Sequence, residues 1–145
     1  MKLAFVYAGQ GSQFAGMGKD LYENYPAARA VFDQFPADFD LRTTCFEDPE
    51  GLLNQTRYTQ PCMLAVAMAI TDILAENGIT PEMTAGLSLG EYSALYCAGV
   101  LDRQTAAELI TFRGQAMQKA SEGVESGMTA ILGLDRELVQ KACDQ

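Results

Sequence analysis

Short apolar runs that alternate with helical stretches constrain the fold of this chain more than any other feature of its sequence. Residues 3–8 are continuously apolar and end in glycine, which is typical of a strand buried on both faces. Residues 84–87 have the same character, and helical patterns occupy much of the chain around these two runs. Strands that alternate with helices imply parallel pairing, so the sequence predicts an α/β layered fold.

Several helices are expected from start and stop signals. Residues 17–35 predict two short helices divided by Pro26, and a short helix is expected around residues 49–53. Thr59 is expected to cap a long helix that has Pro61 in its first turn and Gly78 after its end.

The second half of the chain contains the pattern of three more helices. One should run over residues 89–98 and end at Gly99, and another should run from its cap, Asp102, to about Ser121. After an acidic, glycine-containing loop over 122–126, residues 128–132 predict a strand, and Asp135 begins a helix that continues to the last residue. One strand and one helix cannot bury both their faces, so we expect residues 1–122 to belong to one domain and residues 127–145 to begin a second, incomplete subdomain.

Composition excludes several classes of function. Nineteen acidic against ten basic residues give a formal charge of −9, which repels phosphate backbones, so no nucleic-acid binding is expected. The four cysteines are widely spaced and there is no histidine, which predicts reduced thiols and no metal site. The apolar run at residues 63–70 is too short to span a bilayer, so a soluble, cytoplasmic protein is expected.

The strongest chemical signal is Gly86-Leu87-Ser88-Leu89-Gly90, which lies between a predicted strand and a predicted helix. A sharp strand-to-helix turn exposes the serine oxygen and strains its backbone, and the flanking glycines let strand and helix approach. Unpaired N–H groups at the helix start stabilise a developing oxyanion. Ser88 is therefore the candidate nucleophile, although a capping serine in a glycine-flanked turn gives the same pattern.

A second loop, Gly9-Gln10-Gly11-Ser12-Gln13, follows the first predicted strand, where α/β folds place their ligand loops. The loop is not a phosphate-binding P-loop, because Met17-Gly18 stands where that motif has Lys followed by Ser or Thr. It is not a dinucleotide-binding loop either, because Phe14 stands where the GxGxxG motif has its third glycine. Its backbone is expected to approach the serine, with Gln10 or a neighbouring amide facing the acyl oxygen. The loop alone fits a simple turn equally well.

Taken together, these motifs resemble the malonyl-CoA:acyl carrier protein transacylases. The resemblance runs through all 145 residues and rests on both loops, on Tyr58-Thr59-Gln60-Pro61, on Glu91-Tyr92-Ser93-Ala94 and on Phe112-Arg113-Gly114. It implies an α/β-hydrolase-like parallel sheet flanked by helices, with the start of a ferredoxin-like subdomain at the C-terminal end.

The resemblance also implies chemistry. Ser88 would accept a malonyl group from malonyl-CoA and pass it to the phosphopantetheine thiol of acyl carrier protein, in fatty-acid or polyketide synthesis. Gln10 and the N–H of Leu89 would form the oxyanion hole, and Arg113 would bind the malonyl carboxylate. No metal or tightly bound cofactor is implied, because coenzyme A enters only as part of the substrate.

Two departures from the family pattern matter. Leu87 stands where the family often has a histidine before the nucleophile, which we expect to tune the pocket without abolishing catalysis. The family's general-base histidine comes from a later part of the sequence, and this chain has none. We therefore expect a further C-terminal portion to supply it, and little or no turnover by this chain alone.

Helix geometry addresses whether Arg113 can reach Ser88. A helix over residues 89–98 climbs about 15 Å from the elbow at 1.5 Å per residue, and a short turn sends the next helix back antiparallel. That helix returns to the level of Ser88 at about residue 112, so Arg113 lies at the right height. A guanidinium holds a carboxylate by two parallel hydrogen bonds, although an exposed arginine on a solvated helix face remains the alternative.

Two other functions fit part of the pattern. A serine esterase or thioesterase uses the same elbow, but it does not require an arginine at the acyl site. A non-catalytic docking fragment for a carrier protein agrees with the lack of histidine, but it leaves the glutamine loop, elbow and arginine unexplained. Loss of malonyl selectivity without Arg113 would distinguish the transferase from a simple esterase.

Overall fold

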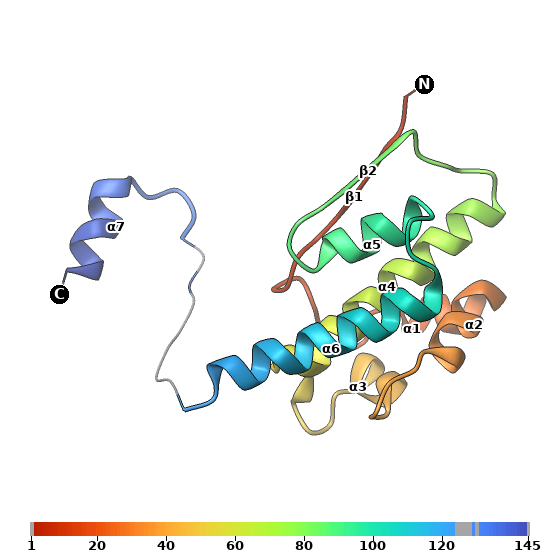
Figure 1. Cartoon of the computed structure of the whole chain (residues 1–145), viewed down its shortest axis with the longest axis horizontal. Coiled ribbons are helices and arrows are strands. Elements are labelled where there is room, and N and C mark those ends of the chain that lie inside the picture. Colours follow the sequence, from red (N-terminus) through yellow and green to blue (C-terminus); the bar gives the residue numbers. More distant parts are fainter. Residues whose placement is uncertain (1, 124–128, 130, 145) are drawn as a thin grey trace.

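The computed structural model describes residues 2–123, 129 and 131–144. Within these residues two strands, β1 (Ala4–Tyr7) and β2 (Met83–Gly86), pair in parallel (Figure 1). A parallel pair needs a long crossover connection, which the helices between the two strands provide. Both predicted strands and their parallel pairing are confirmed, and the chain is an α/β protein with a small parallel sheet.

One face of this sheet is bare in the part of the chain that the structure describes. Val6 and Met83 lie on that face and are 79% and 59% exposed. On the opposite face Thr84 bonds to the α5 helix (Gly90–Cys97), which packs on both strands. The prediction of a first strand buried on both faces is wrong for the described residues, because helices cover only one face of the pair.

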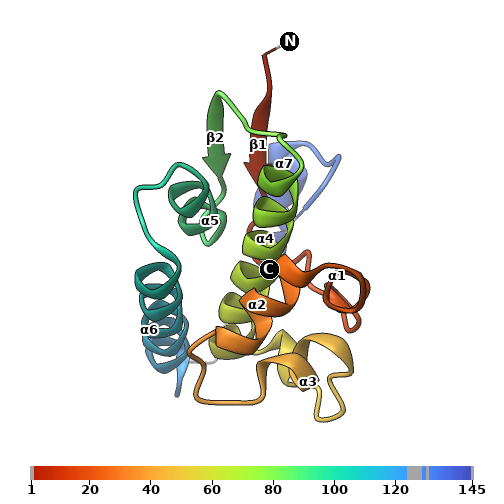
Figure 2. The ribbon, with the colours of Figure 1, turned by 90° about the vertical axis from the view of Figure 1, so that its right-hand side faces the viewer.

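The long helix α4 (Thr56–Glu76) forms the centre of the helical part. The helices α2 (Pro26–Gln34) and α6 (Arg103–Ser121) pack along it, and α5 contacts it as well (Figure 2). Ala106 and Ala107 are wholly buried, and such small side chains let α6 approach α4 closely. Fully buried large side chains complete the core, among them Val31, Leu64, Met68 and Ile110.

Most helices begin and end where the sequence signals place them. The α1 helix (Lys19–Asn24) is separated from α2 before Pro26, and α5 stops ahead of Gly99, whose φ is +71°. Asp102 caps α6, since its carboxylate accepts a hydrogen bond of 2.7 Å from the N–H of Thr105. That bond lowers the pKa of Asp102 below its ordinary value.

The segment between α2 and α4 differs from its prediction. A helix that the sequence analysis missed, α3 (Leu41–Phe46), begins after Asp40, whose carboxylate accepts hydrogen bonds from the N–H and the hydroxyl of Thr43 at 3.0 and 2.8 Å. The helix expected around residues 49–53 is instead a single 3₁₀ turn, Leu52–Asn54. The Asp40 cap stabilises a helix too short to show apolar periodicity.

The start of α4 also corrects the prediction, because the helix begins at Thr56 and Thr59 lies inside it. Thr59 does not cap the helix but donates its hydroxyl to the carbonyl oxygens of Leu53 and Gln55, at 2.6 and 3.0 Å. This buried hydroxyl ties the 3₁₀ turn to the first turn of α4.

Pro61 sits within α4 and has no N–H to offer the carbonyl of Arg57. Gly114 of α6 faces this point, where a Cβ would lie 3.2 Å from both the Cα of Arg57 and the carbonyl oxygen of Thr56. The close approach of α6 to the start of α4 therefore depends on a glycine, and it brings Arg113 to the same level.

The C-terminal predictions fall partly outside the described residues. The loop over 122–126 and the strand over 128–132 include such residues, and within the predicted strand Thr129, Ile131 and Leu132 are not in a strand. The last helix, α7 (Arg136–Cys143), begins after Asp135 as expected and has no buried residue. The division into residues 1–122 and 127–145 stays a prediction.

Two observations concern the apolar helix α4 and the cysteines. By length and composition α4 could cross a membrane, but 56% of its most apolar window is buried, as in the core helix of a soluble protein. All four cysteines are free; Cys45 and Cys62 are buried, Cys97 is half-buried and Cys143 is exposed.

Candidate active site

Ser88 occupies a strained turn between β2 and α5. Its φ is +56°, in the left-handed region that residues with a side chain rarely adopt, and it is exposed. Such strain persists only where the surroundings fix it, and it gathers at functional sites. The turn lifts the hydroxyl of Ser88 away from the sheet at the C-terminal end of β2.

Two glycines make this turn sterically feasible. A Cβ at Gly86 would overlap the backbone of Gly90, and a Cβ at Gly90 would overlap the carbonyl oxygens of Tyr7 and Ala8 in and after β1. The main chains of both strands and of the first turn of α5 therefore meet in direct contact. This close approach is the physical reason for the glycine on each side of the serine.

Arg113 of α6 reaches the serine. Its Nη2 donates a hydrogen bond to the Oγ of Ser88 at 2.9 Å, across 25 positions of sequence. The half-buried guanidinium also lies over the ring of Tyr92, with its Cζ 5.7 Å from the ring centroid. The structure thus brings together the two residues that helix arithmetic placed at one level.

The charge of Arg113 has no carboxylate partner among the residues that the structure describes. The arginines at 42, 57 and 103 each pair with an aspartate, at 3.0, 3.1 and 2.6 Å. A guanidinium has five N–H donors, and the bond to Ser88 uses one. The geometry leaves donors and positive charge available for an anionic group at the serine.

The glutamine loop lies beside the elbow, and the side chain of Gln10 is bonded to the first residue of α4. Its Nε2 donates to the Oγ1 of Thr56 at 3.1 Å. Gln13 ties the loop further, accepting from the N–H of Gly11 at 2.7 Å and donating to Asn54 at 3.2 Å. These bonds fix the loop on the segment that begins α4.

Leu87 and Leu89 flank Ser88 in opposite environments. The Leu87 side chain is 73% exposed and lies against Gly9, where a Cβ would come 2.9 Å from the Leu87 carbonyl oxygen. Leu89 is buried in the core, and its N–H is bonded to no other residue in the described part of the chain. The elbow is thus anchored by Leu89 and closed against the glutamine loop at Leu87.

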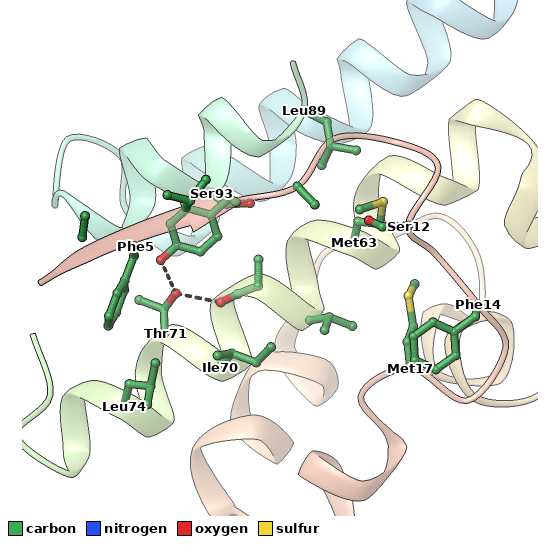
Figure 3. A pocket seen from close by; sticks show the side chains of 16 residues that line it. Phe5, Ser12, Phe14, Met17, Met63, Ile70, Thr71, Leu74, Leu89 and Ser93 are labelled. Atoms are coloured by element: carbon green, nitrogen blue, oxygen red, sulfur yellow. Dashed lines mark hydrogen bonds between the residues drawn. The ribbon is translucent and has the colours of Figure 1, made fainter. Parts of the chain in front are cut away.

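An apolar groove of about 450 Å³ opens between β1 and α4, next to the elbow (Figure 3). Its lining includes Phe5, Phe14, Met63, Ile70, Leu74 and Leu89. At its base the hydroxyls of Tyr7 and Thr71 are hydrogen-bonded at 2.8 Å, and Thr71 donates to the carbonyl of Ala67. Burial, chiefly, raises the pKa of Tyr7 above its ordinary value, so this phenol stays neutral.

Sequence reasoning missed two features of this site. Tyr92 stands four residues after Ser88, a spacing that places both on one side of a helix start, and this signal was available. The groove was not readable, because it depends on how far α4 stands from β1. No cluster of three or more metal-binding side chains is found in the described residues.

Residues 4–145 match the acyl transferase domain family. The chain belongs to this family. It is 43% identical to the malonyl CoA-acyl carrier protein transacylase of Bacillus subtilis and 45% identical to that of Haemophilus influenzae, each over 99% of this chain. These matches confirm the resemblance drawn from the sequence motifs.

Solved structures of the acyl transferase family have the same fold. A malonyl-CoA:acyl carrier protein transacylase from Xanthomonas oryzae superimposes with a TM-score of 0.86 at 41% identity, over 99% of this chain and 48% of that one. A malonyl-transacylase solved with its type II polyketide acyl-carrier protein gives 0.83 at 41% identity, with the same coverage. The chain spans about half the length of the curated relatives it matches, 46% and 47% for the two named above.

Proposed function

We propose that this chain carries the nucleophile and the substrate-selecting arginine of a malonyl-CoA:acyl carrier protein S-malonyltransferase. The Oγ of Ser88 attacks the thioester carbonyl of malonyl-CoA, the C–S bond breaks, and coenzyme A leaves as the thiol. The phosphopantetheine thiol of acyl carrier protein then attacks the Ser88 ester and takes the malonyl group. The observation that carries the proposal is the strained Ser88 hydrogen-bonded to an arginine without a carboxylate partner in the described chain.

Arg113 gives the transferase its preference for a charged acyl group. When a malonyl group occupies the site, its carboxylate takes two parallel hydrogen bonds from the guanidinium. An acetyl group offers no such acceptor and leaves the arginine without an anionic partner, which lowers its affinity. This requirement separates the proposal from a simple esterase.

The oxyanion hole is assigned to backbone N–H groups of Leu89 and Gln10. The N–H of Leu89 stands at the start of α5, where the helix end favours negative charge. The side-chain amide of Gln10 donates one of its two N–H groups to Thr56, and we assign the backbone N–H of Gln10 to the acyl oxygen. Two such donors stabilise the tetrahedral intermediate more than the planar substrate.

The proton of Ser88 requires a base that this chain does not contain, since it has no histidine. We propose that the remaining half of the acyltransferase, either joined to this chain or supplied as a second polypeptide, provides that histidine. It would also add strands to the sheet, cover the exposed face of Val6 and Met83, and fill the groove beside β1. Parallel sheets are covered on both faces, and a two-stranded sheet is not stable alone.

The finer architecture follows from the same proposal. The completed domain would be an α/β-hydrolase-like sheet flanked by helices, and residues 127–145 would begin a ferredoxin-like subdomain. Coenzyme A would enter only with the substrate, and the enzyme would act in the cytoplasm.

The intact mass of the chain after incubation with malonyl-CoA tests the nucleophile. A malonyl adduct on the natural chain, absent from Ser88→Ala, is the expected signature of Ser88. Repeated turnover by the 145-residue chain alone at an enzyme-like rate would contradict the assignment of the base to the other half. An adduct that persists in Ser88→Ala would place the nucleophile elsewhere.

A complementation experiment tests the missing half. The chain is mixed with a polypeptide that carries the remaining sequence of the Haemophilus influenzae relative, and malonyl transfer to acyl carrier protein is followed. Transfer should appear only with both halves and should vanish when the histidine of the added half is replaced. Transfer without that histidine would show that the base lies elsewhere.

A further inference from the structure

The guanidinium of Arg113 lies over the ring of Tyr92 as well as bonding to Ser88. Tyr92 lies in the first turn of α5, four residues after Ser88, and the Cζ of Arg113 lies 5.7 Å from its ring centroid. A cation within about 6 Å of an aromatic ring is attracted to the negative face of the ring. Tyr92 therefore contributes to where the positive charge stands.

The bond between Arg113 and Ser88 cannot hold the arginine throughout the reaction. When Ser88 carries an acyl group, its Oγ becomes an ester oxygen, which accepts hydrogen bonds more weakly than a hydroxyl. The arginine has no carboxylate partner in the described residues to replace it. The contact with Tyr92 is independent of whether the serine is free or acylated.

The ring of Tyr92 is itself fixed in place. It is half-buried and packs against the hydrophobic core of the helical layer. Its hydroxyl makes no hydrogen bond to any residue that the structure describes, so the ring and not the hydroxyl makes the contact that matters.

Two other arginines also lie over tyrosine rings, and they show what is particular about Arg113. Arg42 lies over Tyr22 and Arg57 over Tyr58, at 5.7 and 4.8 Å. Both of these cations also pair with an aspartate, at 3.0 and 3.1 Å, so the ring is a secondary contact. Among the described residues Arg113 contacts only the ring of Tyr92 and the hydroxyl of Ser88 in this way, and acylation of Ser88 converts that hydroxyl into an ester.

We propose that Tyr92 is a positioning residue for acyl-group selection. Its ring holds the guanidinium of Arg113 toward the acyl group both before and after Ser88 is acylated. The inference rests on the proposed role of Arg113 and extends it to a second residue, which acts through the arginine and not on the substrate.

The test compares binding of malonyl-CoA and acetyl-CoA in matched variants. All proteins carry Ser88→Ala so that no adduct forms, and affinities come from calorimetric titrations, which need no arginine as reporter. Tyr92→Leu should lower the ratio of malonyl to acetyl affinity by about two- to fivefold, the strength of a partly exposed cation–π contact. Tyr92→Phe, which keeps the ring, should leave the ratio unchanged.

The same titrations separate the possible outcomes. If the natural side chains show no malonyl preference and Arg113→Ala changes nothing, the proposed function of Arg113 fails and this inference fails with it. If Arg113→Ala abolishes the preference while Tyr92→Leu keeps it, only the inference about Tyr92 is overturned. A merely structural role would weaken both thioesters equally and lower the thermal unfolding temperature.

A second readout needs no change at Tyr92. The ring should shift the side-chain NMR signals of Arg113, which are identified by their loss in Arg113→Lys, and the shift should persist at saturating malonyl-CoA. Disappearance of the ring-induced shift when the ligand binds would mean that the guanidinium leaves the ring, and it would overturn the proposal even if Tyr92→Leu failed to fold.

Discussion

The helix α6 carries one arginine at its start and another near its middle, and the two are held in opposite ways. At its start Arg103 donates to one oxygen of Asp72 at 2.6 Å, while the other oxygen accepts from the hydroxyl of Tyr96, also at 2.6 Å. Ten positions later Arg113 meets only a serine hydroxyl and an aromatic ring. Arg103 is neutralised by Asp72, whereas the charge of Arg113 has no carboxylate partner in the part of the chain that the structure describes.

This difference shows how one helix serves both stability and binding. The Asp72 cluster ties together α4, α5 and α6, because its three side chains come from or just beside these helices. With the start of α6 fixed in this way, the middle of the helix lies over the elbow, where Arg113 has no carboxylate partner among the described residues. A half-buried, unneutralised cation costs stability, which is the usual condition of a binding site.

The largest expected effect comes from removing Arg113 from the middle of α6. Arg113→Ala should reduce the preference for malonyl over acetyl groups about tenfold or more, because a hydrogen bond to a charged group contributes about 1.5–3 kcal/mol. The measurement is the relative rate of adduct formation at Ser88, or the relative affinity of the two thioesters where no adduct accumulates. Equal losses for both thioesters would contradict the carboxylate contact.

The next largest effect comes from breaking the Asp72–Arg103 ion pair at the start of α6. Asp72→Asn should lower the free energy of unfolding by about 1–2 kcal/mol, since it leaves the Arg103 charge uncompensated at a partly buried site. Urea unfolding provides the measurement, and acyl selectivity should not change. The matched control is Asp33→Asn, whose partner Arg42 is half-exposed, so the expected loss is below about 1 kcal/mol. Equal losses in both variants would show that the Asp72 cluster is no anchor.

A smaller effect comes from pH. Burial first, and then the bond to Asp72, raise the pKa of Tyr96 from 10.0 to about 12. A raised pKa stabilises the fold fully below the unfolded pKa, so this contribution should be present up to about pH 10 and disappear between pH 10 and 12. Urea unfolding across this range should show the loss in the natural chain, and Tyr96→Phe should reduce it. An identical pH dependence in both proteins would remove Tyr96 from the cluster's energetics.

The smallest effect is expected beside the nucleophile. Leu87→His should change the free energy of unfolding by no more than about 0.5 kcal/mol, because the side chain is exposed and its removal opens no cavity. The adduct at Ser88 should still form, because the imidazole would take the exposed position of the Leu87 side chain. It should not replace the absent base. Loss of the adduct in mass spectra would mean that Leu87 supports the elbow itself.

Much of this arrangement could be predicted from local sequence signals. The glycines two positions before and after Ser88 predicted the turn, and Asp102 predicted the start of α6. The rise per residue of a helix then predicted that Arg113 lies at the level of Ser88. These are properties of spacing and capping, which act over a few residues. They succeed because the antiparallel return of α6 needs only a short turn at Gly99.

Other features could not be predicted because distant residues decide them. The side chain of Gln10 is bound to Thr56, 46 positions away, so the sequence could not predict where this side chain lies. The exposure of Val6 and Met83 depends on what lies across the sheet, and not on their apolar character. The true start of α4 was obscured because Thr59 and Pro61 imitate a cap and a first turn.

The contact of Gly90 with the carbonyls of Tyr7 and Ala8 has a consequence for how such a site can diversify. Contacts between main-chain atoms fix the position of the Ser88 hydroxyl, and every sequence has the same main-chain atoms. Side chains around it, such as the exposed Leu87, can therefore be exchanged to admit different acyl groups without displacing the nucleophile. Redesign of this protein for new substrates should leave the two elbow glycines alone and vary the residues whose side chains, not backbones, border the serine.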